Sequence, residues 1–160
     1  MIVPDVDQAV FRQLLGRFAT GVTVLTTVGP EGAPVGMTAS SLASVSLEPP
    51  LLSVCVDRAA GLYVPIGTAS HFAVNILAEH QEELSRRFAA GEATPFAGVG
   101  YHVNERGLAL LDGALAHIEC ARHALHPTGD HDIVIGRVIG GATGDGRPLV
   151  YYRGGYASLG

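Results

Sequence analysis

The stretch from Gly36 to Asp57 constrains the fold more than any other part of the chain. It gathers small hydroxyl side chains, turns at the consecutive Pro49 and Pro50, and continues as LLSVCVD. Alternate residues of an extended strand point to opposite sides, so Leu52, Val54 and Val56 share one face. The alternation therefore predicts a strand with one face in the core and the other along a partly polar wall.

The hydroxyl residues before the prolines are open to two interpretations. They are Thr38, Ser40, Ser41 and Ser44. Short side chains in a bend let a ligand approach the backbone N–H groups closely, which suits an anion or a ribityl chain. The same residues are also common in an ordinary Ser- and Thr-rich hairpin. Spacing alone favours neither interpretation.

The rest of the chain predicts a barrel of antiparallel strands with attached helices. A helix should begin after Asp7 as N-cap and end at Gly21, and we expect its apolar face to serve packing only. Two further helices are predicted, one short and limited by Pro65, the other running from Glu79 to about Ala89. Strands are predicted over Val22–Val28, His71–Leu77, Ala114–Leu125, Asp130–Ala142 and Leu149–Tyr152, with a loop and short strands between Gly91 and Gly113. Many strands without regular alternation with helices favour a mainly β fold in one domain covering residues 1–160.

Composition narrows the class of protein. Hydrophobic residues make up 48% of the chain and charged residues 16%, which favours a homodimer that covers apolar surface. The net charge of -5 and the lack of a basic cluster argue against a nucleic-acid partner. The two cysteines are too few for a disulfide framework. With no apparent signal peptide and no run long enough to cross a membrane, we expect a cytoplasmic protein without a membrane partner.

Five ordered segments carry a resemblance to a known family. They are FRQLLGRFATGVTVLT, the Gly36–Asp57 stretch, FAVNIL, GDHDIVIGRV and PLVYYRGGY. In this order they resemble the flavin reductase-like family, the short-chain NAD(P)H:flavin oxidoreductases that serve as reductase components of two-component flavin-dependent monooxygenases. The resemblance implies a Greek-key split β-barrel with FMN or FAD and NADH or NADPH as cofactors. No Rossmann, P-loop or nucleophile-elbow motif is present, so a nicotinamide would bind outside those folds.

The resemblance also implies the residues that contact the flavin. They are Thr38, Ala39, Ser40, Ser41, Val54, Cys55, Val56 and Asp57. Cys55 is interpreted as a small packing residue and not as a nucleophile, because no His/Asp pattern can be assigned to it. Arg58 stands next in the chain, followed by Ala59, where similar reductases usually have Ser or Thr. This departure leaves the choice between FMN and FAD open.

Three further candidates each have a structural alternative. Arg86, with Arg87 beside it, either neutralises the flavin phosphate or pairs with Glu82 and Glu83 on a solvated helix face. Phe88 is expected in the core more than against the flavin. Asn75 either contacts a flavin edge or bonds backbone.

The GDH segment holds the candidate catalytic residue, His131. Without the family motif, His131 would be an exposed histidine at the start of a strand. The resemblance instead implies that Gly129, Asp130 and His131 lie where the nicotinamide approaches, with His131 bonding the carboxamide or influencing ring protonation. Tyr152 and Arg153 are candidate cofactor contacts, and Arg153 and Tyr156 are expected to close either the pocket or the dimer interface.

The expected function is NAD(P)H-dependent reduction of FMN or FAD, with reduced flavin passed to a partner oxygenase. A flavin-binding electron carrier and a non-catalytic flavin-binding module of the same fold are the alternatives. Histidines cluster near Cys120, but His117 and His123 share one strand face while Cys120 and His126 share the other. We therefore expect no metal site.

Overall fold

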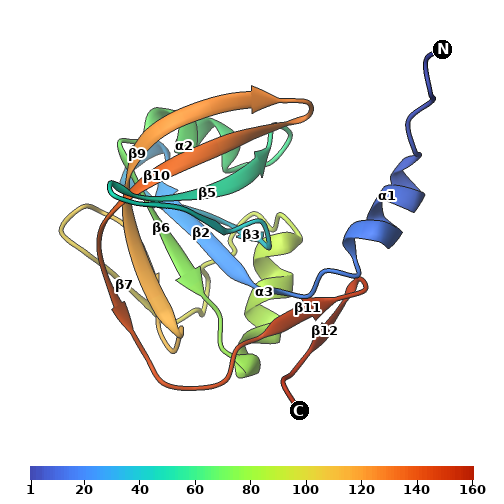
Figure 1. Cartoon of the computed structure of the whole chain (residues 1–160). Coiled ribbons are helices and arrows are strands. Elements are labelled where there is room, and N and C mark those ends of the chain that lie inside the picture. The colour runs from blue at the N-terminus through green and yellow to red at the C-terminus, as the bar shows by residue number, and fades with distance from the viewer.

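The computed structural model describes residues 1–160, and its main body is one strongly curved antiparallel sheet (Figure 1). Seven strands follow the order β3-β2-β6-β9-β10-β5-β4. Their bounds are β2 Thr23–Val28, β3 Pro34–Ala39, β4 Ala43–Leu47, β5 Pro50–Asp57, β6 His71–Ile76, β9 Ala116–Thr128 and β10 His131–Thr143. The mainly β fold predicted from the sequence is therefore confirmed.

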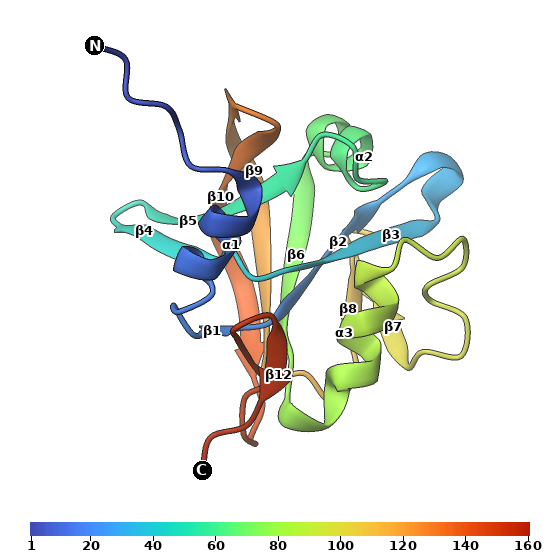
Figure 2. The ribbon, with the colours of Figure 1, turned by 90° about the vertical axis from the view of Figure 1, so that its right-hand side faces the viewer.

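The two edge strands of this sheet, β3 and β4, are neighbours in the chain but are not paired with each other. Only residues 40–42 separate them, so the sheet curls round until its edges nearly meet and leaves a split between them. This is the open seam expected of a split barrel. The hydroxyl-rich residues of the Gly36–Asp57 stretch lie at that seam (Figure 2).

The alternation in β5 places its residues as predicted. Leu52, Val54 and Val56 are buried, whereas Cys55 is half-buried and Asp57 is exposed. The first three join Leu25, Phe72, Val74 and Val134 in the main core. β2 is buried on both faces, and its threonines remain hydrogen-bonded there: Thr26 Oγ1 donates to Ala109 O at 2.7 Å. A buried hydroxyl needs such a partner to avoid a desolvation cost.

Smaller elements cover the sheet. They are α2 Tyr63–Thr68, the 3-10 turns η1 Pro30–Gly32 and η2 Glu79–Gln81, α3 Glu82–Ala89, and the hairpin of β7 Tyr101–Val103 with β8 Ala109–Leu111. A separate three-stranded sheet joins β1 Thr20–Gly21, β11 Val150–Tyr152 and β12 Gly155–Ala157. The short helix, the longer helix and the Gly91–Gly113 region match their predictions, whereas β12 was missed. Of the two predicted ion pairs on α3, Glu82 pairs with Arg86 at 3.5 Å, but Arg87 pairs with Glu92 instead of Glu83.

The first helix departs most from its prediction. α1, Gln8–Leu15, begins as expected, because the Asp7 carboxylate accepts a hydrogen bond from Val10 N at 2.9 Å. It ends at Gly16, well before Gly21, because Gly16 O turns to accept a hydrogen bond from Arg153 N at 2.9 Å. None of its residues is buried, and it lies apart from the sheet beside β11 and β12 (Figure 1). We expected this apolar face to serve packing only, but within this chain it packs into no core.

None of the helices has both the length and the apolar character needed to span a bilayer.

Candidate active site

The seam of the sheet opens into a cavity of about 820 Å³. Six parts of the chain surround it: α1, residues 16–20 up to β1, the segment from β3 to the start of β4, the polar face of β5, the first residue of β10, and the β11–β12 hairpin. Its volume lies in the range of sites that enclose one organic ligand, roughly 300 to 1,000 Å³. The lining residues are Phe11, Arg12, Leu15, Gly16, Phe18, Thr20, Met37, Thr38, Ala39, Ser40, Ser41, Leu42, Ala43, Cys55, Asp57, His131, Tyr151, Tyr152, Arg153 and Gly154.

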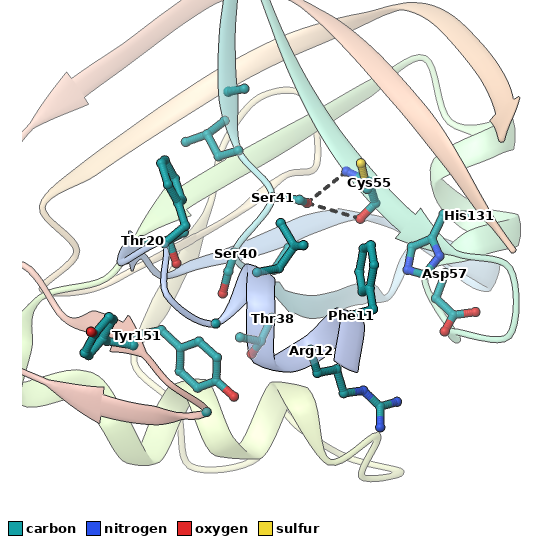
Figure 3. A pocket seen from close by; sticks show the side chains of 18 of the residues that line it. Phe11, Arg12, Thr20, Thr38, Ser40, Ser41, Cys55, Asp57, His131 and Tyr151 are labelled. Atoms are coloured by element: carbon teal, nitrogen blue, oxygen red, sulfur yellow. Dashed lines mark hydrogen bonds between the residues drawn. The ribbon is translucent and has the colours of Figure 1, made fainter. Parts of the chain in front are cut away.

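Ser41 fixes one wall of this cavity. Its Oγ accepts a hydrogen bond from Cys55 N at 2.9 Å and lies 3.4 Å from Cys55 O (Figure 3). The contact joins the β3–β4 connection to β5, next to the Ala43–Ser53 pair of the β4–β5 ladder. The Ser41 hydroxyl therefore ties the wall beside the seam to β5 and takes the Cys55 amide, while neighbouring Ser40 stays exposed at the wall.

Thr38 is tied to a different element. Its Oγ1 donates to Ser85 O of α3 at 2.6 Å, and the Ser85 hydroxyl lies 2.7 Å from the Tyr156 hydroxyl. This series of two hydrogen bonds links β3, α3 and β12. The hydroxyl of Thr38 thus positions the wall, and only its remaining acceptor capacity is open to a ligand.

His131 lies at the rim, held from two sides. The register of β10 on β5 places it opposite Asp57, and the two side chains lie close together in Figure 3. Asp130 Oδ1 lies 2.6 Å from His131 Nδ1. This hydrogen bond keeps the pKa of Asp130 below its usual value. Because an ionised carboxylate only accepts, Nδ1 carries the proton, and a neutral ring keeps Nε2 as an acceptor.

One polar atom in the cavity wall has no partner. Thr20 Oγ1 is the single buried side-chain nitrogen or oxygen in the chain without a hydrogen bond. Thr20 lines the cavity, so its missing partner can be supplied by a ligand or water in that cavity. Together with the small residues along the seam, it fits a polar, planar ligand that approaches the backbone closely.

Helix α1 supplies an apolar wall that the sequence interpretation missed. Phe11 and Leu15 of α1 and Phe18 shortly after it line the cavity, and Figure 3 shows the Phe11 ring directed toward it near His131. Arg12, Thr20 and Tyr151 were missed as well. The only signal for α1 was an apolar stripe at helical spacing, which does not distinguish a core face from a ligand wall.

Several predicted residues lie away from the cavity. Val54 and Val56 point into the core, whereas Cys55 and Asp57, which alternate with them along β5, face the cavity. Asn75 is fully buried and bonds backbone on both sides, donating to Val24 O at 3.0 Å and accepting from Leu111 N at 2.9 Å. The structure therefore contradicts Asn75 as a flavin contact. Of the two alternatives for this residue, it shows the hydrogen bonds to backbone.

Phe88, Arg58 and Arg86 also lie outside the cavity. Phe88 is in the core against Phe96, with ring centroids 4.9 Å apart, as its core interpretation predicted. Arg58 bonds Asp132 at 2.9 Å, which raises the pKa of the arginine. Arg86 lies over the Tyr156 ring at 4.7 Å and lines a second hollow of about 310 Å³. That hollow shares Tyr151 and Gly154 with the main cavity.

The remaining predicted residues gather at one end of the cavity or next to it. Gly129, with φ 64°, forms the β9–β10 turn with Asp130, which places His131 at the rim without lining the cavity itself. Tyr152 and Arg153 do line the cavity, whereas Tyr156 bonds Ser85 behind it. No group of three or more His, Cys, Asp or Glu side chains is arranged to hold a metal ion.

A curled, split sheet with a polar seam, an apolar lid helix and a histidine at the rim defines a class of ligand-binding split barrels. The flavin reductase like domain matches residues 15–160. The chain belongs to the flavin reductase-like family.

Similar proteins agree with this assignment. The reductase subunit HsaB of a flavin-dependent monooxygenase from Rhodococcus jostii is 39% identical, covering 96% of this chain and 79% of that protein. An FMN reductase (NADH), SmoA from Agrobacterium fabrum, is 41% identical over 91% of this chain and 83% of its own length. The NADH:FAD oxidoreductase SgcE6 of Streptomyces globisporus, solved with NAD and FAD fragments, superposes with a TM-score of 0.92. It is 37% identical and covers 100% of this chain and 97% of its own.

Proposed function

We propose that this protein reduces FMN or FAD with NADH or NADPH and passes the reduced flavin to a partner oxygenase. The observation that carries the proposal is the cavity itself, in which a seam of small residues, an orphaned Thr20 hydroxyl and His131 face a common space. Relatives named as flavin reductases across most of the chain support it. When bound, the flavin supplies a ring whose N5 atom takes a hydride from nicotinamide C4.

The chain's own residues have three tasks in this proposal. The seam from Thr38 to Ser41 and the exposed face of β5 hold the planar ring and let it approach the backbone. Phe11, Leu15 and Phe18 exclude water from one side. His131 Nε2, an acceptor because Asp130 holds Nδ1, takes a hydrogen bond from the nicotinamide carboxamide. Positioning of this kind accounts for much of the rate when two reactants must meet face to face.

A homodimer remains part of the proposal. The apolar residues of α1 and of the turn after it stay exposed in one chain: Phe11 by 56%, Leu14 by 60% and Phe18 by 73%. On β4, Leu47 is exposed by 92%. Apolar surface of this kind suits burial against a second copy. Sedimentation of the wild type as a dimer, and of Leu14→Asp as a monomer, would support this assembly; a monomeric wild type would refute it.

The partner oxygenase and the cytoplasmic location are proposed on more general grounds. The relatives described as reductase subunits or components serve oxygenases, and this chain shares most of its length with HsaB. Two unpaired cysteines, Cys55 and Cys120, suit a reducing compartment.

The test is anaerobic reduction of each flavin by each nicotinamide, with wild type and with His131→Ala. Fast, enzyme-dependent bleaching in the wild type and a higher nicotinamide KM in the variant are expected. Tight flavin binding without bleaching would instead indicate an electron carrier or a binding module. Unchanged nicotinamide affinity and hydride rate in His131→Ala would remove His131 from the mechanism.

A further inference from the structure

Two arginines of the cavity wall have no acidic partner. Arg58, Arg86, Arg87, Arg106 and Arg147 each form an ion pair with a carboxylate. Arg12 and Arg153 form none, and both line the cavity. The only acidic residue among the lining residues is Asp57. Although the chain has a net charge of -5, these two guanidinium groups without ion pairs make the charge of the cavity wall positive.

A single glycine joins the segments that carry these arginines. Gly16 N donates to Arg12 O at 2.9 Å, and Gly16 O accepts from Arg153 N at 2.9 Å. A Cβ on Gly16 would lie 2.8 Å from Arg12 O and 3.6 Å from Arg153 Cα. The end of α1 and the β11–β12 turn can approach this closely because residue 16 has no side chain. The backbone segments that carry the two arginines therefore lie at the same edge of the cavity.

Arg153 occupies a backbone position that does not favour arginine. It is the first central residue of the two-residue turn between β11 and β12, with φ 53°, and Gly154 follows with φ 76°. Positive φ at both positions is the geometry of a type I′ hairpin turn, for which Asn, Asp and Gly are preferred. The Arg153 guanidinium lies 5.9 Å from the centre of the Tyr152 ring, a loose contact that leaves its N–H groups free for an acceptor. A strained residue with an unmatched charge at a cavity points to a binding role.

We propose that Arg12 and Arg153 together bind the phosphate groups of the nucleotide that enters the cavity. The planar guanidinium forks match phosphate oxygens in pairs, and two of them suit a pyrophosphate or a phosphate dianion. This assignment rests on the proposed function, which brings two phosphorylated ligands to the cavity. The phosphate belongs either to the flavin or to the nicotinamide dinucleotide, and the two sources are separated by experiment.

Equilibrium binding tests the site without relying on turnover. Arg12→Gln removes one charge, and Arg153→Asn removes the other while keeping a residue that favours the turn. Arg17→Gln is the matched control, since Arg17 is an exposed arginine just after the same helix that does not line the cavity. Fluorescence titration compares FMN with riboflavin, and calorimetry compares NAD⁺ with nicotinamide riboside.

Each cavity variant should bind its phosphorylated ligand about tenfold more weakly and bind the phosphate-free counterpart as the wild type does. The affinity should also depend less on salt, while Arg17→Gln changes neither. A loss confined to FMN assigns the flavin phosphate, and a loss confined to NAD⁺ assigns the dinucleotide. Unchanged affinities, or equal losses for phosphorylated and phosphate-free ligands, overturn the assignment alone. A wild type that binds neither flavin nor nicotinamide overturns the proposed function and this site with it.

Discussion

The Oδ1 atom of Asp130 lies 2.6 Å from Nδ1 of His131 at the rim of the cavity. Asp130 directly precedes β10, and His131 is the first residue of that strand. The pairing fixes which ring nitrogen carries the proton. Asp130 is therefore a positioning residue for His131, although it does not line the cavity.

Substitution of Asp130 should affect nicotinamide binding more than the maximum rate. In Asp130→Ala, His131 loses its acceptor, and we expect the nicotinamide KM to rise roughly three- to tenfold with a smaller change in kcat. Asp130→Asn keeps an acceptor without the charge, so its nicotinamide KM should lie between those of the wild type and Asp130→Ala. Steady-state kinetics check this, and identical KM values in all three proteins would contradict it.

The same pairing has a signed pH dependence. Because the pKa of Asp130 is lowered by its hydrogen bond to His131, the carboxylate stays ionised through the usual carboxyl range, and the pairing is lost only as pH falls through the lowered value. The nicotinamide KM should rise on this acid limb in the wild type. Asp130→Asn, which cannot titrate there, should lack that part of the rise.

Removal of the Ser41 hydroxyl should loosen the seam. Ser41→Ala leaves the Cys55 N–H without its 2.9 Å partner and removes the side-chain link between the β3–β4 connection and β5. We expect a loss of about 1 to 2 kcal/mol in the free energy of unfolding, and weaker flavin binding. Ser40→Ala, at the exposed neighbour, is the control for denaturant titration. Equal stability of the two variants would show that the contact contributes nothing.

The two thiols should differ sharply in reactivity. Burial raises the pKa of Cys120 to about 12, so near pH 8 only about one molecule in ten thousand carries the thiolate. Cys55 is half-buried and lines the cavity. A thiol reagent should therefore label one cysteine per native chain, and bound flavin should slow that reaction. Labelling of Cys120 before Cys55 would contradict the burial of the former.

A methyl group at Gly136 should destabilise the sheet. A Cβ there would lie 2.6 Å from Phe72 Cζ and 2.9 Å from Cys120 Cβ, both of which are fully buried. Gly136→Ala should cost about 1 to 3 kcal/mol of unfolding free energy because a packed core has no room to adjust. Gly61→Ala, where no atom lies within 4 Å, is the matched control. Thermal melts that coincide for the two variants would contradict this packing.

The sequence predicted those parts of the fold that local pattern determines. Period-two alternation placed Val54 and Val56 in the core, and Asp7 was correctly identified as a helix N-cap. The end of α1 was missed because it depends on the hydrogen bond between Gly16 and Arg153, residues far apart in the chain. Asn75 shows the same limit: its amide serves Val24 and Leu111, partners that no local pattern reveals.

The cavity was predictable on its strand side and not on its helix side. The hydroxyl residues and the GDH segment are compact sequence patterns, so they can be identified although their partners, such as Ser85 and Asp57, are far away in the chain. Phe11 reaches the cavity because α1 stays clear of the core. The role of Thr20 depends on its hydroxyl having no hydrogen-bond partner in the folded chain. Both facts depend on the assembled fold, which spacing along the chain does not encode.

We propose that flavin and nicotinamide meet in the cavity at the seam, and anaerobic stopped-flow spectroscopy of the wild type and of Ser40→Trp would test this. Ser40→Trp fills the cavity from an exposed position on its wall and should leave the melting temperature unchanged. We expect fast bleaching of the flavin by NADH or NADPH with the wild type and loss of that acceleration with Ser40→Trp. A wild type that does not accelerate bleaching, or a folded Ser40→Trp that is as fast as the wild type, would contradict it.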